Sequence, residues 1–411
     1  MVPKLRFERY CDNWFSNKLS DLAVDNTLSN GVFNDPLNVG SGYKLINVVN
    51  MYKEPCIDEN DLSLLNLEEK KFRKNQVFFG DIFFTRSSLV KEGIAWTNIY
   101  LGHSEDVTFD GHLIKLTPDL KKTNPKFLYF CLKTSLVRKQ LIESGKTATM
   151  TTIGQSDVGK TLVFIPQLKE QTKIADFLSS VDEKITLLNK QYDLLCQYKK
   201  GMMQKIFSRE LRFKDENGET FPEWNSCQLK DVATRVTRKN KENNQTILTI
   251  SGRDGLVDQM TYFNKQIASK NVSGYYLINN GEFAYNKSYS QGYPMGAIKM
   301  LTNYDQGVVS TLYICFKLNE NQYKNFYQHY FESGLQNRSI EKVAQEGARN
   351  HGLLNIGVND FFDIELQIPS LKEQIKIADF LSALDDKITT KKAELDTLKT
   401  WKQGLLQQMF V

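Results

Sequence analysis

Residues 154–161 read Gly-Gln-Ser-Asp-Val-Gly-Lys-Thr and match the phosphate-binding loop pattern GxxxxGK[ST] at every specified position. A working loop of this kind follows an apolar strand and opens a helix whose N-terminal amides hold a phosphate. Here the preceding residues 147–152 are polar, and the following residues 162–166 read as a strand that ends at proline. In the second half of the chain the same place, residues 357–364, has no lysine. The context argues against nucleotide binding, and an NTPase that depends on Lys160 stays open only as an alternative.

Residues suited to covalent or metal chemistry are scattered along the chain. No metal-ligand spacing and no partnered nucleophile is found among His103, His112, His329 and His351, or among Cys11, Cys56, Cys131, Cys196, Cys227 and Cys315. In a chain of this length such cysteines are typical of buried reduced thiols. An adenine methyltransferase needs an Asn-Pro-Pro-aromatic turn to hold a flipped base, and Asn124-Pro-Lys-Phe reads more simply as a helix start. We predict no catalytic residue, no metal site and no cofactor bound by this chain.

Two polar loops in each half of the chain carry side chains that suit nucleic-acid binding. Arginine, lysine, asparagine, glutamine, serine and threonine are the residue types that contact base edges and phosphates. We predict that DNA is bound by Thr85, Arg86, Ser87, Ser88, Lys91, Lys146, Thr147 and Thr149 in the first half, and by Asn286, Lys287, Ser288, Tyr289, Gln291, Tyr293, Arg349, Asn350 and His351 in the second. The loops differ between the halves, as they must if two different sequences are read. The alternative is that they are ordinary solvated loops.

The composition permits a nucleic-acid partner but does not demand one. The chain has 411 residues, 41% apolar and 25% charged, with a formal charge of +5. The first variable block, residues 13–150, carries 17 basic and 16 acidic side chains, so any DNA affinity there must come from a few well-placed cations. No apolar run is long enough to span a membrane, and the N-terminus lacks the apolar core of a signal peptide. A cytoplasmic location is therefore expected.

An internal repeat organises the chain and places these loops. Residues 165–207 and 368–410 match at 23 of 43 positions without a gap, at an offset of 203 residues. A weaker similarity relates Gly80-Asp81-Ile82 to Gly281-Glu282-Phe283. A period this long is far from the roughly 20–50 residues of solenoid repeats. The chain is therefore a duplicated unit of one variable and one shared block, unless one half has drifted without a function of its own.

The shared blocks read as two long helices. Residues 169–207 contain no proline and one glycine, and their apolar residues recur at steps of three and four, the pattern of a coiled coil. The predicted seam is Leu178, Val181, Ile185, Leu188, Leu195 and Met202 in the first copy and Leu381, Leu384, Ile388, Leu395, Leu398 and Leu405 in the second. Lys199 and Lys402 interrupt the two seams at equivalent positions. An apolar stripe about 58 Å long needs a partner, so we predict that the two helices pack antiparallel around a pseudo-twofold axis.

The variable blocks read as mixed α/β structure with many short strands. Strand-like runs lie at residues 76–85 and 307–318, and helix-like runs follow at residues 125–143 and 321–334. The predicted fold class is α+β, with two globular domains joined by two long antiparallel coiled-coil helices. The predicted boundaries are residues 1–152 and 211–352 for the globular domains and residues 153–210 and 353–411 for the helical regions.

The shared block IPxLKEQxKIADFLSxxDxKI, repeated before a long helix, resembles the conserved regions of the specificity (S) subunits of type I restriction–modification systems. The segments Pro3-Lys-Leu-Arg-Phe with Trp14 and Leu211-Arg-Phe with Trp224 also resemble that family, so the resemblance covers the whole chain. It implies that the variable blocks are two target recognition domains, each reading one half of a split asymmetric DNA site, with the helices as a spacer. We expect the half-sites on one face of the duplex, about 34 Å apart.

The same resemblance implies a non-catalytic subunit that directs partner enzymes. In that family two methylation subunits bind along the helices and methylate adenine N6 with S-adenosylmethionine, and two restriction subunits, using ATP and Mg, add translocation and cleavage. The implied partners are double-stranded DNA and these four subunits in a bacterial cytoplasm, with no membrane. The alternative from another functional class is a coiled-coil scaffold or interaction protein that does not read DNA.

Overall fold

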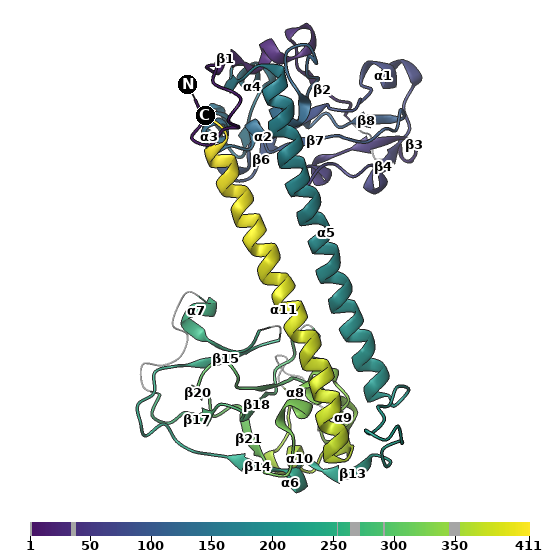
Figure 1. The fold of residues 1–411 in the computed structure, drawn as a ribbon, viewed down its shortest axis with the longest axis vertical. Coiled ribbons are helices and arrows are strands. Elements are labelled where there is room, and N and C mark those ends of the chain that lie inside the picture. The colour runs from purple at the N-terminus through teal and green to yellow at the C-terminus, as the bar shows by residue number, and fades with distance from the viewer. Residues whose placement is uncertain (1, 34–37, 253, 264–271, 291, 345–353) are drawn as a thin grey trace. The chain divides into compact units, whose positions relative to one another are not determined.

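The computed structural model describes residues 2–33, 38–252, 254–263, 272–290, 292–344 and 354–411, which form two compact units (Figure 1). Unit 1 comprises residues 1–191 and 391–411, and unit 2 comprises residues 192–390. Each unit holds one variable block and a stretch of both long helices, α5 (Leu168–Phe207) and α11 (Leu371–Gln408). The four-part division expected above stays a prediction, because the compact units group each variable block with pieces of both helices.

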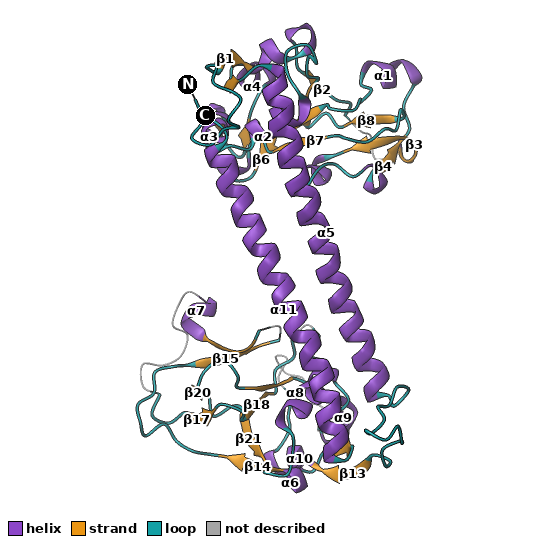
Figure 2. Ribbon diagram, in the orientation of Figure 1, coloured by secondary structure: helices purple, strands orange, loops and turns teal. Residues whose placement is uncertain are grey.

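Unit 1 is built from short strands and helices around an apolar core, and Figure 2 colours helices and strands differently. Its sheets have the strand orders β2 (Ser29–Asn30), β9 (Leu113–Leu116), β5 (Ile82–Thr85), β7 (Thr97–Ile99); β4 (Ser63–Leu65), β3 (Val39–Ile46), β8 (Val107–Phe109); β10 (Lys146–Thr147), β11 (Thr151–Thr152), β6 (Ser87–Ser88); and β1 (Phe15–Lys18), β12 (Leu162–Ile165). Its helices are α1 (Glu69–Lys74), α2 (Pro125–Leu132), α3 (Ser135–Ser144) and α4 (Gln155–Gly159), with short 3-10 turns at Leu19–Leu22, Val24–Asn26, Val48–Tyr52, Glu59–Asp61 and Lys91–Gly93. Among the named strands of unit 1, β3 and β8 pair in parallel and the other pairs are antiparallel.

Unit 2 repeats this plan with its own strands. Its sheets are β14 (Ala233–Val236), β21 (Ile314–Leu318), β18 (Phe283–Asn286), β19 (Ala297–Met300); β15 (Leu248–Ser251), β16 (Gly255–Asp258); β17 (Tyr276–Asn279), β20 (Gln306–Val309); and β13 (Asn225–Gln228), β22 (Glu365–Ile368). Its helices are α6 (Leu229–Val232), α7 (Gln259–Phe263), α8 (Lys324–Ser333), α9 (Asn337–Val343) and α10 (Val358–Phe362). The strands β5 and β18 occupy equivalent places, since each follows a glycine with positive φ, Gly80 and Gly281. The predicted α+β class is confirmed.

Two of the strand-like runs turn out shorter than the sequence suggested. The run 76–85 contributes only β5, because Gly80 turns the chain at φ +92° and the Asp81 carboxylate accepts a hydrogen bond from the amide of Phe78. The run 307–318 is split into β20 and β21 by a turn at residues 310–313. Apolar composition predicted both runs as strands, but it carried no signal for the turns inside them.

Each shared block binds the segment that precedes a variable block through an arginine–glutamate pair. In unit 1, Arg6 Nε and Nη2 donate to the two carboxylate oxygens of Glu170 at 2.6 and 2.7 Å. In unit 2, Arg212 makes the equivalent paired contact with Glu373, at 3.2 and 2.8 Å. Glu170 and Glu373 are the same residue of the duplicated Leu-Lys-Glu-Gln motif, and both are buried. The motif therefore fastens the segment that precedes each variable block to the start of a long helix.

The glutamine of the same motif fastens the variable block itself. Gln171 is fully buried, accepts hydrogen bonds from Thr123 Oγ1 and the Asn124 amide, and donates to the Pro166 carbonyl. Gln374 likewise accepts from the Tyr323 amide. In unit 1 these bonds lie at the start of α2, which Asn124 caps through its Oδ1, as the helix-start interpretation of this segment predicted. The motif thus fixes the start of α2 against α5 in unit 1 and the start of α8 against α11 in unit 2.

The two seam lysines pair with aspartates of the opposite copy. Lys402 contacts Asp182 within unit 1, and Lys199 contacts Asp385 at 2.5 Å within unit 2. Asp182 and Asp385 are themselves equivalent residues of the repeat. Each lysine therefore contacts the aspartate of the other helix, as antiparallel packing of the two helices within each unit requires. Every predicted seam residue is buried or half-buried in the structure.

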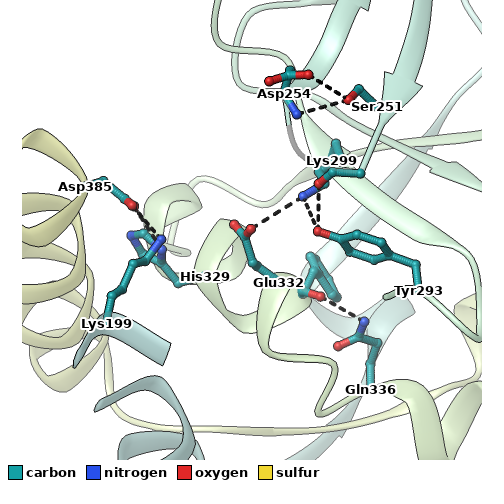
Figure 3. A network of polar contacts seen from close by, with 11 residues as sticks. Lys199, Ser251, Asp254, Tyr293, Lys299, His329, Glu332, Gln336 and Asp385 are labelled. Atoms are coloured by element: carbon teal, nitrogen blue, oxygen red, sulfur yellow. Dashed lines mark hydrogen bonds and ion pairs between the residues drawn. The ribbon is translucent and has the colours of Figure 1, made fainter. Parts of the chain in front are cut away.

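The two lysine–aspartate pairs have different neighbours. In unit 1 the Lys402 ammonium lies 5.6 Å from the centre of the Phe130 ring. In unit 2 the corresponding place holds His329, which is buried, with Nε2 3.2 Å from Ser382 Oγ and Nδ1 3.8 Å from Asp385 (Figure 3). Burial, followed by the nearby Lys199 ammonium, lowers the pKa of His329 to about 4. The histidine is therefore neutral in the folded protein at neutral pH.

We expect unit 2 to lose stability in mild acid because of His329. Its pKa is lowered on folding, so the unfolded chain binds a proton that the folded unit excludes, and the stabilisation present above pH 6.5 disappears as the pH falls toward 4. The loss between pH 7 and pH 5 should be on the order of 1–2 kcal/mol. His329→Phe, which copies Phe130 of unit 1, should remove most of it. Hydrogen exchange of unit 2 at both pH values measures the effect, and equal pH dependence of the two proteins would contradict it.

Candidate nucleic-acid interface

The two predicted DNA-binding loops of unit 1 come together in the structure. β6 pairs antiparallel with β11, and β11 pairs with β10, so Ser87, Ser88, Lys146 and Thr147 belong to one small sheet. The amide of Ile153 donates to the carbonyl of Arg86 at 3.1 Å and continues this pairing. Loops that are distant in the sequence therefore form one continuous surface, as a shared binding role requires.

The side chains on this surface differ in exposure. Lys91, Lys146, Thr147 and Thr149 are exposed, whereas Arg86, Ser87 and Ser88 are half-buried. Thr85 is fully buried at the end of β5, and its Oγ1 accepts a hydrogen bond from the Trp96 amide at 2.8 Å. The expectation that Thr85 contacts DNA directly is thus corrected, because its hydroxyl lies in the core and holds the neighbouring backbone.

Arg86 is a cation of this surface whose backbone is held by hydrogen bonds. Its backbone is fixed on both sides, since its amide donates to the His112 carbonyl at 3.0 Å and its carbonyl accepts from Ile153. Among the residues that the structure describes, the Arg86 guanidinium has no hydrogen bond or ion pair. Lys146, by contrast, lies 3.5 Å from the Asp157 carboxylate. Arg86 therefore combines a fixed backbone with a guanidinium that is available to a ligand, which is the arrangement that base recognition uses.

Lys287 occupies the corresponding place in unit 2. It directly follows β18 as Arg86 follows β5, and its carbonyl accepts from the Leu354 amide at 3.0 Å. Its ammonium lies 3.4 Å from the Ile356 carbonyl. Asn286 caps the adjoining turn by accepting from the Ser288 amide, and Tyr289 is exposed. The two units thus present different side chains from the same position of the same scaffold.

Tyr293 is engaged inside unit 2 (Figure 3). Its hydroxyl donates to the Gly252 carbonyl at 2.7 Å and accepts from Lys299 Nζ at 2.8 Å. Lys299 in turn lies 3.6 Å from the Glu332 carboxylate. Because both hydrogen-bonding capacities of the hydroxyl are used, Tyr293 holds its loop and has no hydroxyl left for a base. Four further predicted residues lie outside the described residues: Gln291, Arg349, Asn350 and His351.

The segment that matches a phosphate-binding loop has a different structure. Gly154 precedes the short helix α4, which ends before Lys160, and the motif is followed directly by the strand β12 and not by a helix. The following strand β12 pairs with β1, and unit 2 repeats the arrangement with α10, β22 and β13. The match is therefore part of the duplicated scaffold. This geometry argues against the NTPase alternative.

The described residues contain no group of three or more histidine, cysteine, aspartate or glutamate side chains that could hold a metal ion. No helix among them is long and apolar enough to cross a membrane.

His112, a neighbour of Arg86, was not predicted as a site residue from the sequence. His112 lies beside Arg86 on the adjoining strand end, and a lone histidine without a spaced partner gave no motif. Its equivalent in unit 2 is Leu312, which lies inside the strand-like run 307–318. Leu89 and Met150 are apolar but exposed side chains of the polar loops, and their exposure was not predicted because their residue type suggests a core.

Comparisons with known proteins agree with this architecture. The family described as type I restriction modification DNA specificity domain matches residues 17–196 and again residues 222–400. The MjaX type I restriction enzyme specificity subunit of Methanocaldococcus jannaschii is 23% identical over 96% of this chain and 92% of its own length. The EcoKI type I restriction enzyme specificity subunit of Escherichia coli is 23% identical over 50% of this chain and 44% of its own length.

Solved structures show the same fold. The S subunit of a type I restriction–modification system from M. genitalium has a TM-score of 0.60 at 16% identity, covering 100% of this chain and 99% of that one. A chain from a study of complex assembly and conformational transition of the type I system has a TM-score of 0.52 at 12% identity, covering 97% of both chains. The fold with two duplicated units and two long helices is therefore shared with these structures.

Proposed function

The chain belongs to the type I restriction modification DNA specificity family, and from that premise we propose that units 1 and 2 each read one half of a split, asymmetric DNA target. A specificity subunit is itself non-catalytic and carries the target recognition domains of the system. The proposal rests on one observation: Arg86 and Lys287 are different cations, and they occupy equivalent positions of a duplicated scaffold. One scaffold with two sets of loop side chains is what reading two different half-sites requires.

We further propose the assembly in which this subunit works. Two methylation subunits would bind along α5 and α11 and methylate adenine N6 with S-adenosylmethionine, and two restriction subunits would use ATP and Mg. The chain itself would bind double-stranded DNA and none of these cofactors. Such a complex works where the chromosome is, which supports a cytoplasmic location. A bacterial host stays a prediction, since the relative from M. jannaschii is archaeal.

Arg86→Ala should relax one half-site and leave the other unchanged. A guanidinium that contacts a base edge contributes about 1–3 kcal/mol of discrimination against the wrong base, which corresponds to at least a fivefold preference at one position. Sequencing of methylated adenines in cells that carry the assembled complex would reveal the recognised sequence and the change. Lys287→Ala is the matched variant, and it should affect only the other half-site.

Two other outcomes would change the interpretation. Equal loss of methylation at all sequences would make Arg86 a phosphate contact, because phosphate contacts carry no sequence information. Methylation without any sequence preference in the unmodified complex would favour the scaffold alternative and contradict the proposed function.

A further inference from the structure

A turn beside Arg86 places a histidine on the predicted DNA-binding surface of unit 1. Thr85 of β5 pairs with Leu113 of β9, so Arg86 and His112 are the next residues beyond that pair. The Arg86 amide donates to the His112 carbonyl at 3.0 Å and confirms this alignment. Side chains of directly opposed residues on neighbouring strands lie on the same face. His112 therefore shares its face with Arg86.

The imidazole of His112 is held by a buried carboxylate. Asp110 Oδ1 lies 2.7 Å from both the His112 amide and His112 Nδ1, and the Asp110 side chain is only 8% exposed while the His112 side chain is 59% exposed. An ionised carboxylate only accepts hydrogen bonds, so Nδ1 donates to Asp110, and in the neutral tautomer that this bond selects Nε2 is an acceptor. Among the described residues Nε2 has no partner. The ring is thus fixed at one end and available to a ligand at the other.

Phe33 completes the surroundings of this ring. It is 67% exposed, and its ring meets His112 edge to face with centres 5.4 Å apart. It lies directly over Gly111, where any side chain would collide with it at 2.9 Å. The Gly111 amide donates to the Val32 carbonyl at 2.8 Å, which fixes the loop that carries Phe33. This edge of unit 1 therefore offers a ligand both an exposed aromatic ring and an imidazole held in one orientation.

Unit 2 contains the same turn with a different side chain. β21 pairs with β18 up to Tyr285–Ile314, and Lys287 and Leu312 stand two residues beyond that pair, as Arg86 and His112 stand beyond Phe84–Ile114 in unit 1. Ser310 Oγ accepts from the Leu312 amide, which copies the contact between Asp110 and the His112 amide. Leu312 is 69% exposed. The scaffold therefore presents a hydrogen-bond acceptor in one unit and an apolar side chain in the other.

We infer that residues 110–112 and 310–312 are a second base-reading element, with His112 and Leu312 as specificity-determining residues. This inference rests on the proposed function and adds a contact to each half-site. His112 Nε2 would accept from the exocyclic amino group of adenine or cytosine in the major groove, and Leu312 would contact the methyl group of thymine. Asp110 is a positioning residue that sets the imidazole tautomer.

The test uses the assembled complex and a map of methylated adenines. His112→Ala should reduce discrimination about tenfold at one base position of one half-site, and Leu312→Ala should do so at one position of the other. His112→Gln, which keeps an acceptor, should retain part of the preference. His103→Ala is the matched control, because His103 is an exposed histidine of unit 1 that stacks on Phe79 away from the turn.

The outcomes separate this inference from the proposed function. A wild-type sequence preference that survives both alanine variants would overturn the base-reading role of the turn and leave the proposed function intact. Absence of any preference in the wild-type complex would overturn the proposed function itself. A uniform loss of methylation in His112→Ala, with the preference unchanged, would make the turn a structural or phosphate-contacting element and would equally reject the inference.

Discussion

Inserting four residues into each long helix, after Gln191 in α5 and after Thr390 in α11, is expected to lengthen the preferred spacer between the two half-sites by about one to two base pairs. These positions are the boundaries between units 1 and 2, so the insertions leave the contacts inside each unit intact. Four helical residues add about 6 Å of length and slightly more than one turn. The bases within each half-site should stay the same, because Arg86 and Lys287 are held within their own units.

The measurement is again the map of methylated adenines, now read for the spacing between half-sites. Insertion into α5 alone is the control, because it shifts the seam of one helix against the other and should abolish ordered packing. The contacts Lys402–Asp182 and Lys199–Asp385 each lie within one unit, so the double insertion preserves both. A spacer that stays unchanged in the double insertion would contradict the idea that the helices set it.

The repeat was the strongest signal in the sequence, and it predicted the scaffold well. Glu170 and Glu373, like Gln171 and Gln374, are identical because both copies must fasten a variable block to a helix through the same buried contacts. The partners of the two seam lysines, Lys199 and Lys402, could also have been predicted from the sequence. In an antiparallel pair each lysine faces the opposite copy, and the repeat supplies an aspartate there.

The loops were less predictable, because residue type does not show which way a side chain faces. Thr85 and Arg86 are adjacent and polar, yet one is buried at the end of β5 and the other lies on the surface. Tyr293 has a residue type suited to a base, but its hydroxyl is bonded to Gly252, which is 41 residues away in the sequence, and to Lys299 of β19. Tertiary hydrogen bonds decided these cases, and no local pattern encodes them.

The turns within apolar runs failed for a related reason. Residues 307–318 are rich in apolar and β-branched types, which predicts a strand whether or not the chain turns within it. Leu312 lies within this run, yet it is exposed at the turn. The residue type of Leu312 therefore gave no sign that its side chain is exposed. His112 was not predicted for another reason. Its partner Asp110 is only two residues away, and the segment that contains both residues matches no motif.

Replacing Glu170 with glutamine is expected to lower the free energy of unfolding of unit 1 by about 3–5 kcal/mol. Glu170 is buried and binds two nitrogens of Arg6, whose side chain is only 10% exposed. These bonds raise the pKa of Arg6, so the guanidinium stays charged, and removing the carboxylate leaves a buried charge without its counter-ion. Arg6 also has no other acceptor among the described side chains, and its Nη1 is already unpartnered there.

Unit 2 supplies the matched comparison. Arg212 donates to the carbonyls of Phe221 and Pro222 and to Glu223 in addition to Glu373, so Glu373→Gln should cost only about 1–2 kcal/mol. Hydrogen exchange would assign each loss to its unit, since two compact units need not unfold as one. The double variant Arg6→Met with Glu170→Leu removes both charges and should recover most of the lost stability. If Glu170→Gln and Glu373→Gln were equally costly, the additional acceptors of Arg212 would have no compensating effect and the explanation of the difference would be wrong.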